Sequence, residues 1–390
     1  MRVAVVYGRI PSGHASAAQA LESHLRARGC ECVPVSAASD INPVLGPFLD
    51  KLYVCVLESC PWLWRAIYDR RAVSGAAGIF QSLYWRFCAP QVLGAIEKIE
   101  PDVIVCTHAA PLAVLALGKA RGLVRPKLVA CPTDYDVHSF WMSPKVDLYL
   151  APSAFAAGRL AEAGIERARI VETGIPIDEV FATPLDKTQA RRGLGLRAQG
   201  PVLLLSGGSR GLGGIAQAAE VLLKGCPRAQ VAVLCGENKR LWSRLDAAAK
   251  SEPRLRAYLR ADKNLVRRLM AAADALIGKA GGVTLAEASA AGVPVVFWGA
   301  LPGQEERNAR RWLGAGAARE ARSAADLLRS ISILISDRAE AAALIENAEA
   351  LSRPAAGWAA ADAVLGLGTL RARLAPPLAS AAGECPSGAL

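Results

Sequence analysis

Short apolar runs alternate with amphipathic, helix-like stretches along almost the whole chain of 390 residues. This alternation predicts parallel β-strands joined by crossover helices, and it occurs in two successive halves. In the first half, strands are expected at residues 2–7, 31–35, 103–106, 127–131, 148–151 and 170–172. In the second half, strands are expected at residues 202–206, 230–235, 255–259, 275–277, 293–298 and 316–319. The pattern therefore predicts an α/β protein with two parallel sheets.

The same pattern places the domain boundaries. Residues 1–174 are expected to form an N-terminal Rossmann-like domain, and residues 201–350 a second one, since the chain is long enough for two. The Pro- and Gly-containing residues 175–200 are interpreted as the linker. The Ala-rich tract after Asp337 predicts helices, with a last helix at residues 351–375, and residues 376–390 are expected to be a frayed tail.

Composition excludes several classes of protein. A chain that is 52% hydrophobic and 21% charged is expected to be globular, not disordered. The longest weakly polar run, residues 103–118, contains His108 and Pro111 and is shorter than the ~20 apolar residues of a spanning helix. The first seven residues are interpreted as a buried strand and not as a signal peptide. Ten cysteines without a CxxC pair are typical of reduced core residues, which indicates a cytosolic protein.

The net charge of +11 is concentrated in one region. Residues 187–270 hold 17 Lys and Arg against 5 Asp and Glu. No nucleic-acid motif accompanies this charge, so a nucleic-acid partner is not expected. A basic surface attracted to an anionic membrane or to a diphosphate fits better, although a solvated face without a partner explains the charge equally well.

Residues 278–308 carry the richest chemistry. Two glycines open a helix directly after a strand, so free backbone N–H groups and the helix dipole suit a diphosphate. Glu287 lies one turn further on, where it can accept hydrogen bonds from a sugar diol. The alternative is an ordinary strand-loop-helix unit, but several polar features at matched offsets favour a nucleotide-sugar site. The candidates are Gly281, Gly282, Thr284, Glu287, Gln304 and Glu305.

Two loops of the first half contain candidates for acid–base chemistry. His14 follows the first strand in the run Ser12-Gly13-His14, where it could accept a proton from a hydroxyl or simply belong to a helix-capping loop. Asp134 and His138 follow another strand in the run 132–141, PTDYDVHSFW, which is otherwise a solvated Asx-turn. Both loops are expected at the sheet edge where α/β proteins bind ligands.

Two further segments leave more than one interpretation open. The Gly-rich loop after the first strand of the second half, with Gly208, Ser209 and Gly211, lets a phosphate approach the backbone but is weak evidence alone. Residues 48–88 hold nine of the 22 aromatics, interleaved with arginines. They are equally consistent with an amphipathic surface in a lipid interface and with core helices. The membrane and acceptor candidates there are Trp62, Trp64, Arg65 and Trp85.

These segments resemble those of known enzymes. Residues 281–304 resemble the donor-binding signature of GT-B glycosyltransferases. The Ser-Gly-His loop and the TD-x-x-x-H-x-x-W segment are similar to those of the monogalactosyldiacylglycerol synthases and processive diacylglycerol glucosyltransferases. The Gly-Gly-Ser-x-Gly loop is closer to that of the N-acetylglucosaminyltransferase that completes the peptidoglycan lipid precursor.

The resemblance implies a GT-B fold, in which two Rossmann-like domains face a cleft and the last helix crosses back to the first domain. It implies an inverting transferase that moves glucose or galactose from a UDP-sugar to a diacylglycerol-type lipid, with no metal and no other cofactor. Residues 48–88 would contact membrane and acceptor, and the protein would be cytoplasmic, peripheral on the inner face of the cell membrane.

The resemblance also implies roles for single residues. His14, Asp134 and His138 would be the catalytic residues. Gly236 and Asn238 would flank the nucleotide, and the backbone near residues 264–267 would contact uracil. Three alternatives remain: N-acetylglucosamine transfer to the peptidoglycan precursor, epimerisation of a UDP-sugar on the same fold, and a binding module without activity.

Overall fold

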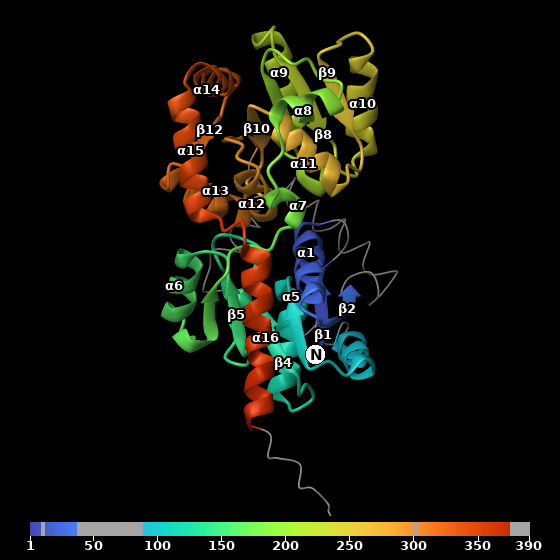
Figure 1. Ribbon diagram of the computed structural model, residues 1–390, viewed down its shortest axis with the longest axis vertical. Coiled ribbons are helices and arrows are strands. Elements are labelled where there is room, and N and C mark those ends of the chain that lie inside the picture. The colour runs from blue at the N-terminus through green and yellow to red at the C-terminus, as the bar shows by residue number, and fades with distance from the viewer. Residues whose placement is uncertain (9–11, 37–88, 300–302, 375–390) are drawn as a thin grey trace, which may run out of the picture.

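The computed structural model describes residues 1–8, 12–36, 89–299 and 303–374, which form two parallel β-sheets with flanking helices, one above the other (Figure 1). The first sheet has the order β2-β1-β3-β4-β5-β6, and all its printed pairs are parallel. Its strands are β1 (Arg2–Tyr7), β2 (Glu31–Ser36), β3 (Val103–Cys106), β4 (Lys127–Ala130), β5 (Leu148–Ala151) and β6 (Ile170–Glu172). Its helical elements are α1 (Gly13–Ala27), a helix at residues 89–99, α5 (Ala109–Ala120), η1 (Ser139–Trp141) and α6 (Ala154–Glu162).

The second sheet repeats this construction with the order β12-β11-β10-β7-β8-β9. Its strands are β7 (Val202–Ser206), β8 (Gln230–Leu234), β9 (Leu255–Tyr258), β10 (Ala275–Gly278), β11 (Val295–Phe297) and β12 (Ala318–Glu320). Its helical elements are η3 (Gly208–Arg210), α9 (Ile215–Gly225), α10 (Lys239–Ala249), α11 (Lys263–Ala272), α12 (Gly282–Ala290), α13 (Gln304–Gly314), α14 (Ala324–Ser336) and α15 (Arg338–Leu351). The predicted α/β class and all twelve predicted strands are confirmed, with strand ends within two residues of those expected.

The segment interpreted as a linker contains two short helices, α7 (Glu179–Ala182) and α8 (Lys187–Gly193). The buried Arg191 of α8 donates to the carbonyl of Ala272 and pairs with Asp274, so α8 packs on the second sheet's side of the molecule. The domain boundaries themselves stay a prediction.

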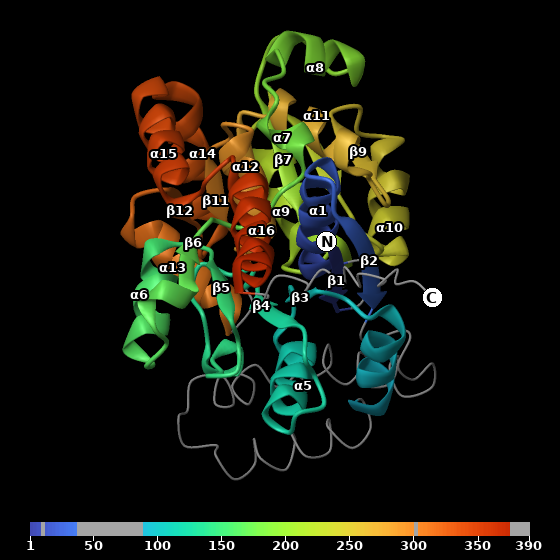
Figure 2. The ribbon, with the colours of Figure 1, turned by 60° about the horizontal axis from the view of Figure 1, so that its bottom comes forward.

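The last helix, α16 (Ala356–Leu374), leaves the second half and runs along the first sheet beside α1 (Figures 1 and 2). Ala360, Ala361 and Val364 are fully buried in the core that contains β1. Arg28 of α1 forms two hydrogen bonds with Asp362 and also lies over the Trp358 ring. The crossing-back helix expected for a GT-B fold is therefore present.

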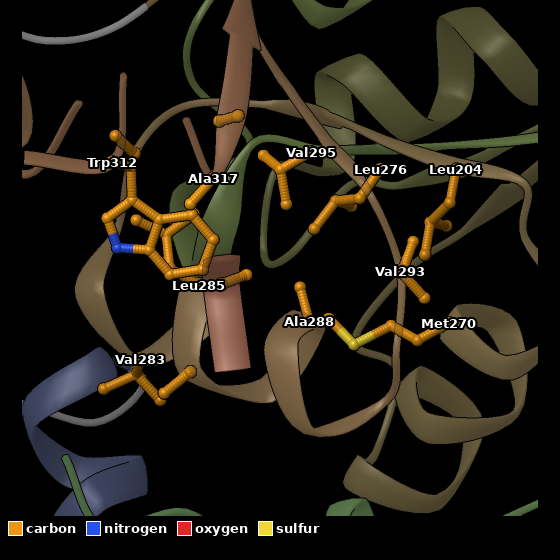
Figure 3. Close-up of a cluster of buried hydrophobic side chains, with 14 of the residues drawn as sticks. Leu204, Met270, Leu276, Val283, Leu285, Ala288, Val293, Val295, Trp312 and Ala317 are labelled. Atoms are coloured by element: carbon orange, nitrogen blue, oxygen red, sulfur yellow. The ribbon is translucent and has the colours of Figure 1, made fainter. Parts of the chain in front are cut away.

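The carboxyl ends of the two sheets face each other across one apolar cluster. This cluster joins Ala17 of α1 and Tyr135 of the first half to Val283 and Trp312 of the second. Figure 3 shows the second-half part of the cluster, with Val283 pointing toward α1. Side chains at the two carboxyl edges are thereby held close to one another.

In each sheet the strand order reverses beside the first strand of that half, between β1 and β3 and between β7 and β10. Ligands of open α/β sheets bind outside the carboxyl ends of the strands at such a switch point. The loops before α1, α5, α9 and α12 all start at these switch points. His14 and the candidates at residues 208–211 and 281–287 lie in or just after three of these loops, whereas the candidates at residues 134–138, 236–238 and 304–305 follow β4, β8 and β11.

Candidate functional site

His14 lies at the start of α1 and is held by contacts from the loops that follow β3 and β4. Its Nδ1 atom and Thr133 Oγ1 are 2.7 Å apart, and Thr107 Oγ1 donates to its carbonyl oxygen at 2.9 Å. The His108 ring stands edge-on to the His14 ring, with centroids 4.7 Å apart. Ser12 caps the helix by accepting from the Ala15 N–H, so the predicted capping loop and the placed histidine coexist.

Burial decides the protonation of these groups. It lowers the pKa of His14, against the opposing charge of Asp134, so the imidazole is neutral near pH 7. Burial also lowers the pKa of His108 and of His138 to about 3. For Asp134, burial raises the pKa, while His14 and the hydrogen bond from Asn308 act in the opposite direction.

Asp134 is tied to the second half of the molecule. Asn308 Nδ2 on α13 donates to Asp134 Oδ1 at 2.8 Å and to the carbonyl of Ala280 at 3.0 Å. The backbone N–H of Tyr135 donates to Asn308 Oδ1 at 2.8 Å. Asn308 thereby holds Asp134, a catalytic candidate of the first half, against the donor-site candidates of the second half.

At Gly282 the backbones of the two halves come into close contact. A Cβ atom built on Gly282 would lie 2.1 Å from the carbonyl oxygen of Thr133. Because this oxygen belongs to the backbone, it cannot move aside as the end of a flexible side chain can. This position therefore requires glycine. The close packing of α12 on the 133–134 segment therefore gives the second glycine a structural reason.

The described α-helices differ in how their first turns are capped. Nine described α-helices have an N-cap side chain that accepts from a first-turn N–H: α1, α5, α6, α7, α8, α10, α11, α14 and α15. Three begin at a glycine with no side-chain cap: α9 at Gly214, α12 at Gly281 and α13 at Gly303. Uncapped first turns leave N–H groups that an anion can satisfy. All three uncapped helices start at the carboxyl edge that faces His14.

Lys279 connects the loops on the donor side, although sequence reasoning did not single it out. It forms an ion pair with the buried Glu305 at the start of α13. Its side chain also lies over Gly208, where a Cβ would be 2.8 Å from Lys279 Cε. A cation thus stands between the loops after β7 and β10 and the start of α13.

Other candidates of the second half have structural roles that are visible in the fold. Gly211 and Gly236 have positive φ, and they let the loops after β7 and β8 pack backbone to backbone. A Cβ on Gly236 would lie 2.3 Å from the Ser209 carbonyl oxygen. Asn238 caps α10 by accepting from the Leu241 N–H at 2.9 Å. Whether these residues also contact a donor stays a prediction.

Glu287 lies on α12, one turn beyond Thr284, and is partly buried. Burial, with a smaller contribution from the charge of Asp178, raises its pKa to about 8. Asp178 caps α7 and pairs with Lys263 at the start of α11. The ribose-diol candidate therefore stands beside the segment where uracil is expected, and it is largely protonated at pH 7.

Near the start of α13, two buried hydrogen-bond acceptors lack a partner among the described residues. They are Oδ1 of Asp136 and Oε1 of Gln304. Arg307 lies one turn from Gln304 on α13, and its Nη1 is 3.8 Å from Asp136 Oδ2, so both acceptors border the same helix face. A buried acceptor without a donor costs about 1–3 kcal/mol, which a ligand hydroxyl would offset.

The remaining sequence candidates divide into two groups. His138 caps η1 through Nδ1, which accepts from the Phe140 N–H, and its ring lies 6.2 Å from that of Trp141. Trp62, Trp64, Arg65 and Trp85 lie outside the described residues. Within the described part of the chain, every helix is too short or too polar to cross a membrane.

Comparison with known proteins supports the resemblance inferred from the motifs. Residues 14–177 match the sequence model of the monogalactosyldiacylglycerol synthase family. The chain is 26% identical over 358 residues to a processive diacylglycerol beta-glucosyltransferase of Bacillus pumilus, covering 90% of this chain and 91% of that protein. It is 28% identical over 350 residues to the enzyme of the same name from Bacillus licheniformis, covering 87% and 88%.

Solved structures show the same fold. A putative UDP-N-acetylglucosamine 2-epimerase from Listeria monocytogenes superimposes with a TM-score of 0.65 at 15% identity, covering 97% of this chain and 98% of that chain. MurG from Acinetobacter baumannii superimposes with a TM-score of 0.60 at 14% identity, covering 94% and 100%. The chain thus has the GT-B fold, and its sequence is similar to those of glycolipid glycosyltransferases of the monogalactosyldiacylglycerol synthase type.

Proposed function

We propose that this protein is an inverting glycosyltransferase that moves glucose or galactose from a UDP-sugar to a diacylglycerol-type lipid. The observation that carries the proposal is the contrast in helix capping. The uncapped starts of α9, α12 and α13 face a histidine and a carboxylate held by the other half. The similarity to diacylglycerol glucosyltransferases over most of the chain supports a lipid glycosyltransferase as the general class.

The proposed reaction is a single displacement. The acceptor hydroxyl oxygen bonds to the anomeric carbon from the face opposite UDP, the bond from that carbon to the diphosphate oxygen breaks, and UDP leaves. The hydroxyl proton passes to His14, which burial keeps neutral, with Asp134 beside it to balance the imidazolium charge. Asp134 itself is the alternative base.

The charge that develops on UDP would be stabilised by the uncapped helix starts and by Lys279. With these groups, the proposed reaction needs no metal ion or other cofactor. Glu287 would accept from the ribose hydroxyls, and the unpartnered acceptors of Gln304 and Asp136 would accept from hexose hydroxyls.

The acceptor implies a membrane partner. A diacylglycerol is held in a bilayer, so a protein that acts on it must work at the lipid surface. The net charge of +11 favours an anionic surface, in line with a peripheral position at the cytoplasmic face of the cell membrane.

Product analysis tests the proposal. The purified protein is incubated with radiolabelled UDP-glucose, UDP-galactose or UDP-N-acetylglucosamine and with vesicles that contain diacylglycerol. Label in a β-linked glycolipid from glucose or galactose is the expected result. A new UDP-sugar without labelled lipid would indicate an epimerase. Transfer of N-acetylglucosamine only to an added peptidoglycan lipid precursor would indicate the other transferase.

A further inference from the structure

We infer that Asn308 is a positioning residue that makes the placement of Asp134 and His14 depend on contact between the two halves of the molecule. The inference rests on the proposed function, because it names a residue that orients the groups proposed to handle the acceptor proton. Asn308 does not stand next to these groups in sequence, and it belongs to the half that would bind the donor.

The hydrogen bonds of Asn308 match an asparagine amide and no other side chain of this size. The Tyr135 N–H can only donate, so the atom that faces it must be the amide oxygen. The amide nitrogen then faces two acceptors, the Asp134 carboxylate and the Ala280 carbonyl. Asn308 is fully buried, so water cannot replace these partners.

The bonds of Asn308 extend to the proposed base in two steps. It fixes the side chain of Asp134 and the backbone of Tyr135. Thr133, directly before them, contacts His14 Nδ1 and presses its carbonyl against Gly282 of α12. The third bond, to Ala280, fixes the loop that leads into α12. One amide thus sets the distance between the proton acceptors and the proposed diphosphate site.

An isosteric replacement separates positioning from packing. Asn308→Asp keeps the volume but sets a carboxylate against the Asp134 carboxylate and the Ala280 carbonyl. Asn308→Ala only removes the bonds. If the hydrogen bonds matter, Asn308→Asp loses at least as much activity as Asn308→Ala at pH 8.5. The activity that Asn308→Asp loses relative to wild type should become smaller as pH falls, because one proton shared by the two carboxylates restores a hydrogen bond. If Asn308 only filled space, Asn308→Asp would be more active than Asn308→Ala.

The experiment measures kcat and KM for UDP-glucose and UDP-galactose with diacylglycerol in mixed micelles, and UDP affinity by calorimetry. For Asn308→Ala we expect kcat to fall about 10–100-fold, since a misplacement of ~1 Å can cost ~10²-fold, while the Kd for UDP changes less than about fivefold. Deuterium uptake by the peptide that contains the Tyr135 amide should rise, because that N–H loses its acceptor. Asn347→Ala on α15, which removes an asparagine bond to the Gly316 carbonyl, is the control for the loss of a side-chain amide away from the site.

Three results would overturn the inference. One is a kcat of Asn308→Ala within twofold of wild type, and another is higher activity of Asn308→Asp than of Asn308→Ala at pH 8.5. The third is unchanged deuterium uptake at Tyr135. Failure of the proposed function is a different result: wild type would transfer no hexose to lipid, and deuterium uptake alone would then decide whether Asn308 holds the segment.

Discussion

At the level of single residues, the His14 ring is held in one orientation and is uncharged near pH 7. Thr133 contacts its Nδ1 and Thr107 donates to its carbonyl oxygen, and these contacts fix the ring. Nε2 is then the ring nitrogen that could accept a proton. Burial, which lowers its pKa, makes the unprotonated form the main one at neutral pH. A general base needs this combination, since it must be in reach of its proton and free to accept it.

His14→Ala is expected to lower kcat by about 10²–10⁴-fold, the usual contribution of a positioned base, with little change in UDP affinity. In wild type, activity should fall with decreasing pH only below the usual histidine value of ~6.5, because the pKa is lowered. Steady-state kinetics over pH 5 to 9 test both statements. If Asp134→Ala abolishes turnover while His14→Ala stays near wild type, Asp134 is the base.

Glu287 gives a proton-linked test of donor binding. Glu287→Ala should weaken UDP binding by roughly 1.5–3 kcal/mol, the value of a hydrogen bond to a charged group. Because the pKa of Glu287 is about 8 and the carboxylate is the better acceptor, UDP binding by wild type should release a proton and strengthen from pH 6.5 to 8.5. UDP has titrating groups of its own at the edges of this range, its terminal phosphate and its uracil N–H, so Glu287→Gln serves as the control. Calorimetry that gives the same pH slope for wild type and Glu287→Gln would remove Glu287 from the site.

At the scale of the element, the strands were predictable because their apolar runs are short, buried and bounded by polar turns. Every residue is buried in β3, β7, β8 and β10, which leaves little freedom for the ends of those strands. The glycine start of α12 was also visible, since Gly281 comes shortly after the end of β10. What the sequence pattern could not show is which helix starts lack a cap, because capping is decided by side-chain geometry in the fold.

Residues that act between elements were missed for a related reason. Asn308 meets Asp134 across 174 positions of sequence, and Lys279 meets Glu305 across 26. Neither pairing leaves a local pattern. Asn308 does lie one helical turn after Gln304, on the same face of α13, and that spacing is the one signal that could have drawn attention to it.

The contact of α12 with the 133–134 segment can be tested by adding one methyl group. Gly282→Ala places a Cβ 2.1 Å from the Thr133 carbonyl oxygen, so α12 or the segment must shift. Overpacking of this kind typically costs ~1–3 kcal/mol, and the melting temperature should fall accordingly. Gly281→Ala is the neighbouring control for stability, because the nearest atom to its Cβ is Thr284 Oγ1 at 3.9 Å. Equal melting temperatures for the two variants would contradict the tight contact.

At the scale of the whole molecule, the two halves are joined by more than the chain segment between the sheets. Helix α16 returns to the first half, where Arg28, Trp358 and Asp362 link it to α1. The Tyr135 side chain, buried beside Trp312 and bonded to Ser352, reaches from the first half into the second. A donor bound by one half and an acceptor bound by the other would therefore meet in a site that both halves build.

Binding to a membrane would depend on the total charge of the protein and on the aromatic segment 48–88. The protein should sediment with vesicles that contain anionic lipid, and binding should weaken as salt rises, because part of the attraction between a +11 protein and the surface is screened. Replacing Trp62, Trp64 and Trp85 by Ala should reduce both vesicle binding and activity on lipid acceptors while the melting temperature stays near that of wild type. If these side chains are core residues, the same change should instead lower the melting temperature sharply, since truncating a buried Trp costs ~3–5 kcal/mol. Sedimentation and thermal unfolding of the same preparation separate the two cases: early unfolding with normal lipid binding by the folded fraction would exclude a membrane role for this segment.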